Sequence, residues 1–367
     1  MKKIVFLIAF GILLSIFVAE IFLRLFKSET TLKFYDNPVF GSAFVPNQKG
    51  VFVTETKEYF SNVEINSQGW PDFEHSFEKP RDVYRILILG DSFVENLQVP
   101  FEKRFFRQLQ DKLGNKFEII AMGRGNTGTA QQYLMLKEYG LKYKPDLVIQ
   151  MFLTANDVKN NSSVLQNDPY LPYFEIESNN SLKEISQIKR SNRKLSSLKE
   201  ILKKCEITKI ILFFRQKYLE RKAISLSGGY PTDYHIYDSI YSADYQNSWE
   251  LTKRLILETK RVTENSQAKY ILVTLANNEQ VNTKVQGEIF KKYPNLKNAN
   301  PDFEKPDKIL KEYCQEQKID CFFMLPYFKD YIKNNPNETT HFFYDGHWSQ
   351  TGTNLAALFL YQIISQN

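Results

Sequence analysis

Five short apolar runs alternate with segments of helical periodicity, and this alternation constrains the fold more than any other feature. The apolar runs lie at residues 86–89, 117–121, 147–153, 270–275 and 321–325. The helical patterns lie at residues 103–113, 130–139, 249–264, 307–317 and 351–365. Uninterrupted apolar runs are typical of strands buried on both faces, and strands that alternate with helices favour a parallel sheet covered on each side. The pattern therefore predicts an α/β fold with a parallel sheet of about five strands.

The N-terminus carries a different signal, because Lys2 and Lys3 precede an apolar stretch over residues 4–26 with few polar interruptions. As a helix this stretch is about 34 Å long at ~1.5 Å per residue, which is enough to cross the hydrocarbon core of a bilayer. Residues 1–27 have two interpretations, an uncleaved membrane anchor and a cleaved signal segment. The anchor is favoured, because the bulky Phe17 stands where a cleavage site requires a small residue.

The anchor interpretation also predicts an orientation. Lys2 and Lys3 hold the N-terminus in the cytoplasm, so the rest of the chain is expected outside it, in the periplasm or the extracellular space. Glu20 and Arg24 are four residues apart and are expected to pair near the membrane interface. In that oxidising space Cys314 and Cys321 have two interpretations, a disulfide and a pair of buried thiols.

Residues 28–80 are polar and aromatic, with apolar–polar alternation at residues 51–54 and 63–66. We predict that they form short strands and turns, a lead-in to the domain of residues 81–367. The spacing of the predicted elements breaks once, at residues 160–245. A crossover between parallel strands needs far fewer residues, so this segment is predicted to be an insertion.

Within the insertion we expect a hairpin near residues 173–176 and helices from residue 182 to residue 225. Residues 183–222 hold 13 Lys/Arg against 4 Asp/Glu, although the whole chain carries a net charge of only +6. One interpretation is a helical hairpin with a solvated basic face, and the other is a surface for anionic lipid or an acidic polymer. The modest overall charge does not predict nucleic acid as a partner.

Polar side chains follow the predicted strands where they end, and the carboxyl ends of parallel strands share one edge of the sheet. The first strand runs into Gly90-Asp91-Ser92, the second into the loop of residues 123–129, and the third into Asn156-Asp157. The loop before the last helix contributes Asp345-Gly346-His347. A hydroxyl, a glycine-rich loop, an amide and an Asp/His pair are thus expected together. Acyl transfer through a serine ester needs these parts.

The residue types suggest a role for each. Serine is a poor nucleophile at neutral pH, so Ser92 needs a base, and His347 is the best placed of the four histidines because Asp345 can orient its ring. The developing oxyanion needs donors, for which the candidates are the backbone N–H of Ser92, an N–H of the 123–129 loop and the side-chain amide of Asn156.

Each of these residues also has a purely structural interpretation. Ser92 fits a helix N-cap, Asn156 a turn, and Asp345 the cap of the last helix. Their joint occurrence at successive strand ends favours chemistry instead. The remaining histidines have no such context: His75, His235 and His341. No metal or cofactor is predicted, because a third metal ligand, the full dinucleotide fingerprint and a P-loop are all missing from the sequence.

In this order the residues resemble the SGNH, or GDSL, hydrolase superfamily, and most of all its membrane-anchored bacterial members and relatives that handle O-acetyl groups on polysaccharides. The resemblance covers about residues 60–365 and is weakest at the insertion. It is carried by Ile65-Asn66-Ser67-Gln68-Gly69, Gly90-Asp91-Ser92-Phe93-Val94-Glu95, Asn156-Asp157 and Asp345-Gly346-His347-Trp348. The resemblance implies a flavodoxin-like three-layer fold, with Ser92 as nucleophile, His347 as base and Asp345 as its partner.

Two residues depart from the family pattern. Asn126 stands where a glycine usually gives its N–H to the oxyanion hole, and Ala155 stands where a glycine often precedes the asparagine of the third block. Asparagine tolerates a left-handed backbone better than most residues, so Asn126 is assigned to the oxyanion hole with Ser92 and Asn156. A shift of one residue would assign the same role to Gly125.

The main hypothesis is a serine esterase that acts on an acylated carbohydrate or another small ester, with transfer of the acyl group to a sugar as a close variant. A second hypothesis is a binding or assembly protein of the cell envelope that has this fold without catalysis. The departures from the family pattern at Asn126 and Ala155 support it. A third is a lipid-directed esterase held at the membrane by residues 1–27 and the basic insertion.

Overall fold

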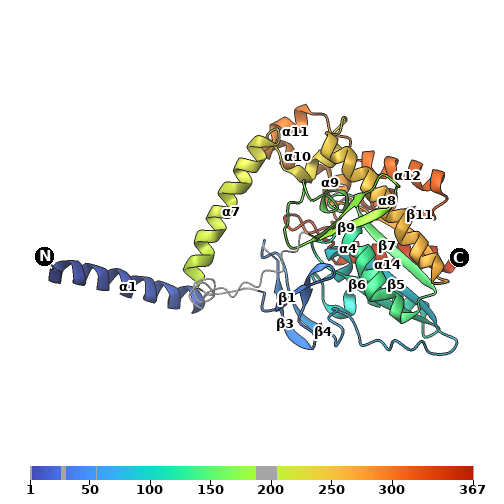
Figure 1. Cartoon of the computed structure of the whole chain (residues 1–367), viewed down its shortest axis with the longest axis horizontal. Helices are drawn as coiled ribbons and strands as arrows, with labels where there is room; N and C mark the ends of the chain where they lie inside the picture. The colour runs from blue at the N-terminus through green and yellow to red at the C-terminus, as the bar shows by residue number, and fades with distance from the viewer. Residues whose placement is uncertain (1, 26–29, 55, 187–204, 367) are drawn as a thin grey trace. The chain divides into compact units, whose positions relative to one another are not determined.

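The structure is a computed structural model that describes residues 2–25, 30–54, 56–186 and 205–366. It divides into two compact units (Figure 1). The sheet unit comprises residues 30–189 and 232–367, and the helical unit comprises residues 1–29 and 190–231. The predicted insertion is therefore divided between the two units, which are described separately.

The core of the sheet unit is a five-stranded parallel sheet with the order β11-β10-β7-β5-β6. Its strands are β5 (Tyr84–Gly90), β6 (Phe117–Gly123), β7 (Leu147–Leu153), β10 (Lys269–Leu275) and β11 (Cys321–Phe323). Numbered along the chain, the spatial order is 2-1-3-4-5, which is the flavodoxin-like order. The predicted fold class is confirmed.

Helices cover both faces of this sheet, as the alternation of buried residues along its strands requires. Ile86 and Ile88 pack in one cluster with residues of α3, α13 and α14, whereas Leu87 and Leu89 pack in another with residues of α4. Helices α8 and α12 continue the second layer over β10. The bounds are α3 Phe105–Leu113, α4 Thr129–Glu138, α8 Ala243–Asn265, α12 Lys305–Gln317, α13 Met324–Asn334 and α14 Gln350–Gln366.

One predicted strand is too long. The apolar run at residues 321–325 is a strand only as far as Phe323, and α13 begins at Met324. Met324, Leu325 and Phe328 are buried at helical spacing against the main cluster, so packing decides in favour of a helix. The shorter elements that complete the unit are α2 (Ser92–Glu95), η1 (Phe101–Lys103), η2 (Gly140–Tyr143), α5 (Asp157–Asn160), η3 (Thr232–Tyr237), α9 (Asn278–Val281), α10 (Thr283–Lys292) and α11 (Pro294–Asn298).

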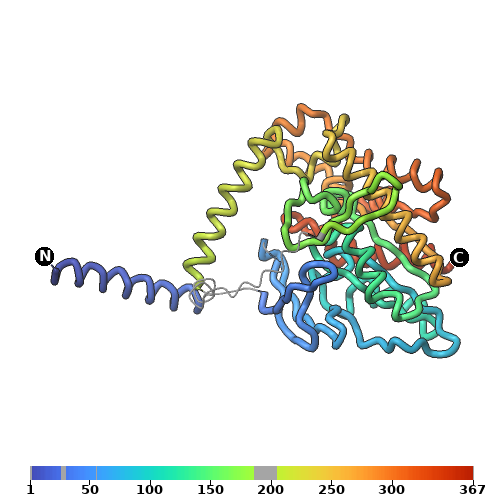
Figure 2. Tube along the Cα trace, viewed as in Figure 1, coloured from blue at the N-terminus to red at the C-terminus, as the bar shows by residue number. Residues whose placement is uncertain are grey.

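Two antiparallel hairpins precede the sheet, and they can be followed in blue along the trace in Figure 2. They pair β1 (Phe34–Asn37) with β2 (Gly41–Phe44) and β3 (Gln48–Val53) with β4 (Phe60–Ile65). The two strands predicted in the lead-in correspond to β3 and β4. Val63 and Ile65 of β4 are buried in a small cluster with Leu97, which follows α2, so the second hairpin packs directly beside the end of the first sheet strand.

The predicted hairpin in the insertion is confirmed, since β8 (Pro172–Ile176) pairs with β9 (Leu182–Ser186). The helix predicted from residue 182 is wrong at its start, because residues 182–186 form this second strand. A turn in which Asn180 has φ of +67° reverses the chain before Leu182. Residues 187–204 lie outside the described residues, so the prediction for them stays a prediction.

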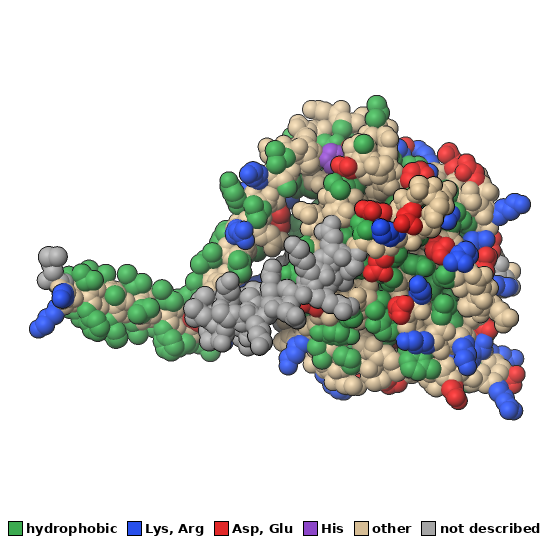
Figure 3. All heavy atoms as spheres, in the orientation of Figure 1, with side chains coloured by type: hydrophobic (Ala, Val, Ile, Leu, Met, Phe, Trp, Pro, Cys, Tyr) green, Lys and Arg blue, Asp and Glu red, His purple; other side chains and the backbone are tan. Residues whose placement is uncertain are grey.

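The helical unit contains α1 (Lys2–Leu25) and α7 (Glu206–Leu226). Among the described helices, α1 is the one long and apolar enough to cross a membrane, a property that signal sequences share. Hydrophobic side chains cover it in Figure 3. Arg24 pairs with Glu20 at 2.8 Å, as predicted, and the Glu20 carboxylate accepts the backbone N–H groups of Glu206 and Ile207 at 3.0 and 3.2 Å. Glu20 therefore caps the first turn of α7.

The cysteines of the sheet unit are free thiols. Cys314 is buried on α12, and its thiol hydrogen-bonds with that of Cys321 on β11. This bond and burial raise the pKa of Cys321. Of the two interpretations of this pair, a disulfide and two thiols, the structure has the thiols.

Candidate active site

Ser92 lies in a tightly packed corner at the end of β5, which we call the nucleophile corner (residues 90–95 with residues 123–125). The Asp91 side chain caps α2 by accepting the N–H of Phe93 at 2.9 Å, so α2 begins at Ser92. A Cβ atom on Gly123 would lie 2.2 Å from the backbone nitrogen of Glu95, and one on Gly90 would lie 2.3 Å from Cγ2 of Val94. Only glycines let α2 lie this close to the strand ends, and this contact fixes Ser92 at the edge of the sheet.

Asp345 and His347 come from a short hairpin before α14, which we call the acid–base loop (residues 340–348). The N–H of Phe342 donates to the carbonyl of His347 at 2.8 Å, and the N–H of Ser349 donates to that of Thr340 at 3.0 Å. Gly346 turns the chain with φ of +82°. A Cβ atom on Gly352 of α14 would lie 2.0 Å from the Thr340 carbonyl oxygen, so the base of the loop rests on that helix.

The structure brings the three predicted residues into one hydrogen-bonded line. Ser92 Oγ lies 2.7 Å from His347 Nε2, and His347 Nδ1 lies 2.7 Å from Asp345 Oδ1. Ser92 and His347 are separated by 255 positions along the chain, so the fold and not local sequence brings them together. The His347 side chain is 23% exposed, so the site can be reached from solvent.

The electrostatics of this line favour a basic imidazole. Burial lowers the pKa of His347, but the hydrogen bond to Asp345 and the negative charge of that carboxylate raise it, and the net pKa lies above its usual value. The Phe93 ring packs on the imidazole with centroids 4.9 Å apart. A positive charge on the His347 ring is therefore stabilised by the Asp345 carboxylate at Nδ1.

Asn156 reaches the same corner from the end of β7. Its Nδ2 donates to Asp91 Oδ2 at 3.1 Å, which uses one of its two amide protons. Burial raises the pKa of Asp91, and burial together with the charge of Asp91 raises that of Asp157. Asp157 accepts the N–H of Leu153 at 3.2 Å, which fixes the turn that presents Asn156.

The second loop contributes two adjacent candidates for the oxyanion hole. Asn126 has φ of +63°, the left-handed conformation that its position was expected to need, but its side chain is exposed and accepts Gln166 Nε2 at 3.2 Å. A Cβ atom on Gly125 would lie 3.6 Å from Ser92 Cβ, so Gly125 borders Ser92. In the described part of the chain neither backbone N–H has a hydrogen-bond acceptor.

Two residues near the site were not predicted. Glu95 on α2 is buried and accepts Arg124 at 2.6 Å, and the Arg124 guanidinium also donates to the Ser42 carbonyl at 2.7 Å. The carboxylate of Glu58, in the turn between β3 and β4, accepts backbone N–H groups of the acid–base loop. Glu95 is part of the quoted motif, whereas no pattern in the sequence marks Glu58.

The histidines that lacked context in the sequence do not join the line. His341 is buried at the base of the acid–base loop, with Nε2 2.9 Å from the Ala276 carbonyl and Nδ1 2.9 Å from Thr340 Oγ1. Burial lowers the pKa of His341 to about 4, so it is neutral at physiological pH. Among the described residues no group of three His, Cys, Asp or Glu side chains is arranged to hold a metal ion.

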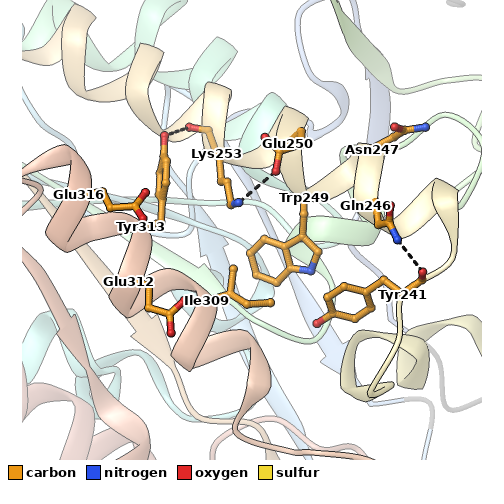
Figure 4. Close-up of a pocket in the computed structure, with 10 residues that line it drawn as sticks. All are labelled: Tyr241, Gln246, Asn247, Trp249, Glu250, Lys253, Ile309, Glu312, Tyr313 and Glu316. Carbon is orange, nitrogen blue, oxygen red and sulfur yellow. Dashed lines mark hydrogen bonds and ion pairs between the residues drawn. The ribbon is translucent and has the colours of Figure 1, made fainter.

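Two of the surface hollows of the sheet unit differ in how they lie relative to the candidate site. One of about 1190 Å³ borders the acid–base loop at Phe343, Tyr344 and Asp345 and continues along α10. The other, about 460 Å³, lies between α8 and α12 around Trp249 and Tyr313, and Figure 4 shows its lining residues. The second hollow shares no residue with the candidate site.

No protein-family model matches the chain, and no curated protein matches its sequence. Solved structures of esterases and lipases do resemble it. An acetyl xylan esterase is 13% identical, with a TM-score of 0.41 over 76% of this chain and 99% of that one. A carbohydrate acetylesterase from Sinorhizobium meliloti is 14% identical, with a TM-score of 0.38 over 77% and 99%. A GDSL-like lipase from Bacteroides thetaiotaomicron is 12% identical, with a TM-score of 0.37 over 80% and 92%.

Proposed function

We propose that the protein is a serine ester hydrolase that forms an acyl intermediate on Ser92. The observation that carries this proposal is the line from Ser92 Oγ through His347 to Asp345, with both hydrogen bonds at 2.7 Å. The N-cap of α2 is Asp91 and not Ser92, so the Ser92 hydroxyl has no capping role, and a loop histidine has no need of a carboxylate behind it. The combination is what activates a serine.

In the first half of the reaction, Ser92 Oγ attacks the carbonyl carbon of the ester while its proton passes to His347 Nε2. The Asp345 carboxylate stabilises the imidazolium that results. The tetrahedral intermediate then collapses, the bond to the leaving alcohol breaks, and the departing oxygen takes the proton from His347 Nε2. An acyl ester of Ser92 remains.

In the second half, an acceptor hydroxyl attacks the acyl-Ser92 ester and gives its proton to His347, which returns it to Ser92 Oγ as the acyl group leaves. With water as acceptor a carboxylic acid is released, and with a sugar hydroxyl a new ester is formed. We propose hydrolysis as the main activity and acyl transfer as its variant, since the same residues serve both.

The oxyanion has three proposed donors. The backbone N–H of Ser92 lies at the N-terminus of α2, and the second amide proton of Asn156 is available because its first is given to Asp91. The third is a backbone N–H of the second loop. Asn126 is the residue assigned from the sequence, and the proximity of Gly125 to Ser92 favours the one-residue shift.

The proposed substrate is an acylated carbohydrate or another small ester, with O-acetyl groups of an envelope glycan as the most specific form. The acyl carbonyl is the part of the substrate that the geometry of Ser92 and His347 requires. The proposal that the ester is carried by a carbohydrate rests on the family resemblance of the sequence.

The proposed location is the outer side of the cytoplasmic membrane, with α1 as a single-pass anchor. The helical unit adds a proposal for lipid contact, because α7 exposes Ile210, Ile211, Phe214 and Tyr218 along one stripe and carries five Lys or Arg side chains. We propose that this stripe lies on anionic lipid next to the end of α1, to which Glu20 ties it.

A pair of labels tests the lipid contact. In the full chain with its cysteines replaced by serine, an environment-sensitive dye is placed at Phe214→Cys or, as a control on an exposed strand position, at Glu64→Cys. In vesicles of phosphatidylglycerol and phosphatidylcholine the dye at position 214 is expected to report an apolar environment and the dye at position 64 water. Equal spectra at both positions would rule the contact out.

The esterase proposal is tested by covalent labelling. The chain is incubated with p-nitrophenyl acetate, with and without a fluorophosphonate, and the labelled residue is identified by mass spectrometry. We expect label on Ser92 and loss of turnover, and neither turnover nor label in Ser92→Ala, whose melting temperature should stay near that of the wild type. A folded wild-type chain without label or turnover would refute the proposal and leave the binding or assembly protein of the envelope.

A further inference from the structure

The turn between β3 and β4 touches the acid–base loop through Glu58. The Glu58 carboxylate accepts the backbone N–H of Tyr344 at 3.1 Å on each oxygen and the N–H of Asp345 at 2.6 Å on Oε2. The next residue, Tyr59, places its ring 5.8 Å from that of Phe342. A segment almost 290 positions away in sequence thus holds the residue that pairs with His347.

The tip of the acid–base loop has few other contacts that would hold it in place. Tyr344 is 77% exposed and Phe343 is 40% exposed, so the tip gains little from hydrophobic burial. Asn278 of α9 donates its amide to the carbonyls of Phe342 and Phe343 at 3.1 and 3.4 Å. Asn278 therefore holds carbonyl groups of the loop, while Glu58 holds its N–H groups. Hydrogen bonds to a carboxylate are the stronger kind.

The same hairpin is also anchored along β4, beside the nucleophile corner. Ser61 Oγ of β4 donates to the Leu97 carbonyl at 2.6 Å, two residues after α2 ends. Val63 and Ile65 are buried against the Leu97 side chain. The hairpin therefore connects the nucleophile corner with the acid–base loop, and its geometry helps to set the separation between Ser92 and His347.

We infer that Glu58 is a positioning residue for the Asp345–His347 pair, so that the lead-in hairpin is part of the active site. Glu58 acts through the backbone, because its bond to the Asp345 N–H fixes the peptide from which the Asp345 side chain reaches His347. Gly346, with φ of +82° and open space around it, would otherwise let this peptide turn. The inference rests on the proposed function of Ser92, His347 and Asp345.

Kinetics of the full chain test this inference with a control from the same hairpin. Glu64 on β4 pairs with Lys49 at 2.6 Å and has a 70% exposed side chain, so Glu64→Gln should behave like the wild type. Glu58→Ala is expected to lower kcat about 10- to 100-fold with an unchanged KM, because a displacement of about 1 Å at a reacting group has effects of this size. Glu58→Gln should lose less, since its amide oxygen still accepts an N–H.

A double-mutant cycle separates positioning from general stabilisation. If Glu58 acts through Asp345, adding Glu58→Ala to Asp345→Asn lowers kcat no further. A loss of the same size in both backgrounds would overturn the inference, as would a Glu58→Ala variant with wild-type kcat. The melting temperatures of Glu58→Ala and Glu64→Gln should lie close together.

The titration of His347, followed by NMR of its ring nitrogens, needs no turnover and so tests Glu58 apart from the proposed function. The groups that act on the His347 charge are Asp345, Asp91 and Glu95, with the neutral His341 packed nearby. None of these is replaced in Glu58→Ala, but the variant also loses the Glu58 carboxylate itself. Glu58→Gln loses the same carboxylate and keeps an oxygen that accepts an N–H, so a pKa of His347 that is lower in Glu58→Ala than in Glu58→Gln reports a displaced Asp345 carboxylate. Equal pKa values of His347 in the two variants would overturn the inference. A wild-type chain that hydrolyses no ester would refute the proposed function and leave this result standing.

Discussion

The nucleophile corner and the acid–base loop meet at one hydrogen bond, but they are held in place by different forces. In the corner, backbone packs against backbone with no room for a side chain at Gly90 or Gly123. At the tip of the loop the side chains are exposed, and the main chain is held because it donates hydrogen bonds to Glu58 and accepts them from Asn278. The position of Ser92 is therefore set by excluded volume, whereas that of Asp345 is set by directional bonds from distant segments. This difference predicts how each region responds to substitution.

Apart from the loss of Ser92 itself, the largest effect is expected from Asp345→Asn in the loop. The amide cannot stabilise the imidazolium, so kcat should fall by a factor on the order of 10³–10⁴, which corresponds to roughly 4–5.5 kcal/mol of transition-state stabilisation. The melting temperature should change little, because the loop tip contributes few buried contacts. Steady-state kinetics and a thermal melt together check this, and a kcat within tenfold of the wild type would contradict it.

The pH profile of the same variant has a definite sign. The base must be neutral to accept a proton from Ser92, so kcat/KM of the wild type should fall as the pH drops through the pKa of His347. Asp345 raises that pKa above its usual value. Removing the carboxylate charge lowers it, so the acid limb of the residual activity in Asp345→Asn should move to lower pH.

The next largest effect is expected in the corner and should appear as lost stability. Gly123→Ala places a methyl group against the backbone of Val94 and Glu95, so the free energy of unfolding should fall by about 1–3 kcal/mol. Gly287→Ala on α10 is the matched control, because nothing lies within 4 Å of the added carbon, and it should be neutral or stabilising by up to ~1 kcal/mol. Equal denaturation midpoints for the two variants would contradict the claim that excluded volume holds the nucleophile corner in place.

The same contrast explains what the sequence revealed. The strands of the main sheet, five of the six helices that cover it and the residues at the strand ends were predictable, whereas α13 was not. Apolar runs and their carboxyl ends place Ser92 and Asn156 with little dependence on distant contacts. The pairing of Asp345 and His347 was predictable from their spacing of two residues. Strand β11 was predicted too long because Met324 and Leu325 are apolar in a helix as well as in a strand.

Other features depend on contacts that no local pattern encodes. Glu58 is one of many acidic residues in a polar segment, and only the fold places it beside Tyr344 and Asp345. The strand β9 was mistaken for a helix because its partner, β8, decides its conformation. Gly125 borders Ser92 because the second loop passes close to α2. Counting positions along the sequence motif does not show which residue of this loop lies next to Ser92.

The smallest effect is expected from Asn278→Ala, which removes the amide that holds the Phe342 and Phe343 carbonyls. Phe342 O still accepts the Gly346 N–H at 3.1 Å, so stability should change little. The value of kcat should fall about tenfold, the equivalent of ~1.4 kcal/mol, because the loop tip can then move. Asn282→Ala is the control, since Asn282 caps α10 by accepting the Lys284 N–H at 3.0 Å. That variant should lose about 1 kcal/mol of stability with an unchanged kcat. If Asn278→Ala instead loses stability and keeps its kcat, the tip is held by packing, and the loop does not differ from the corner.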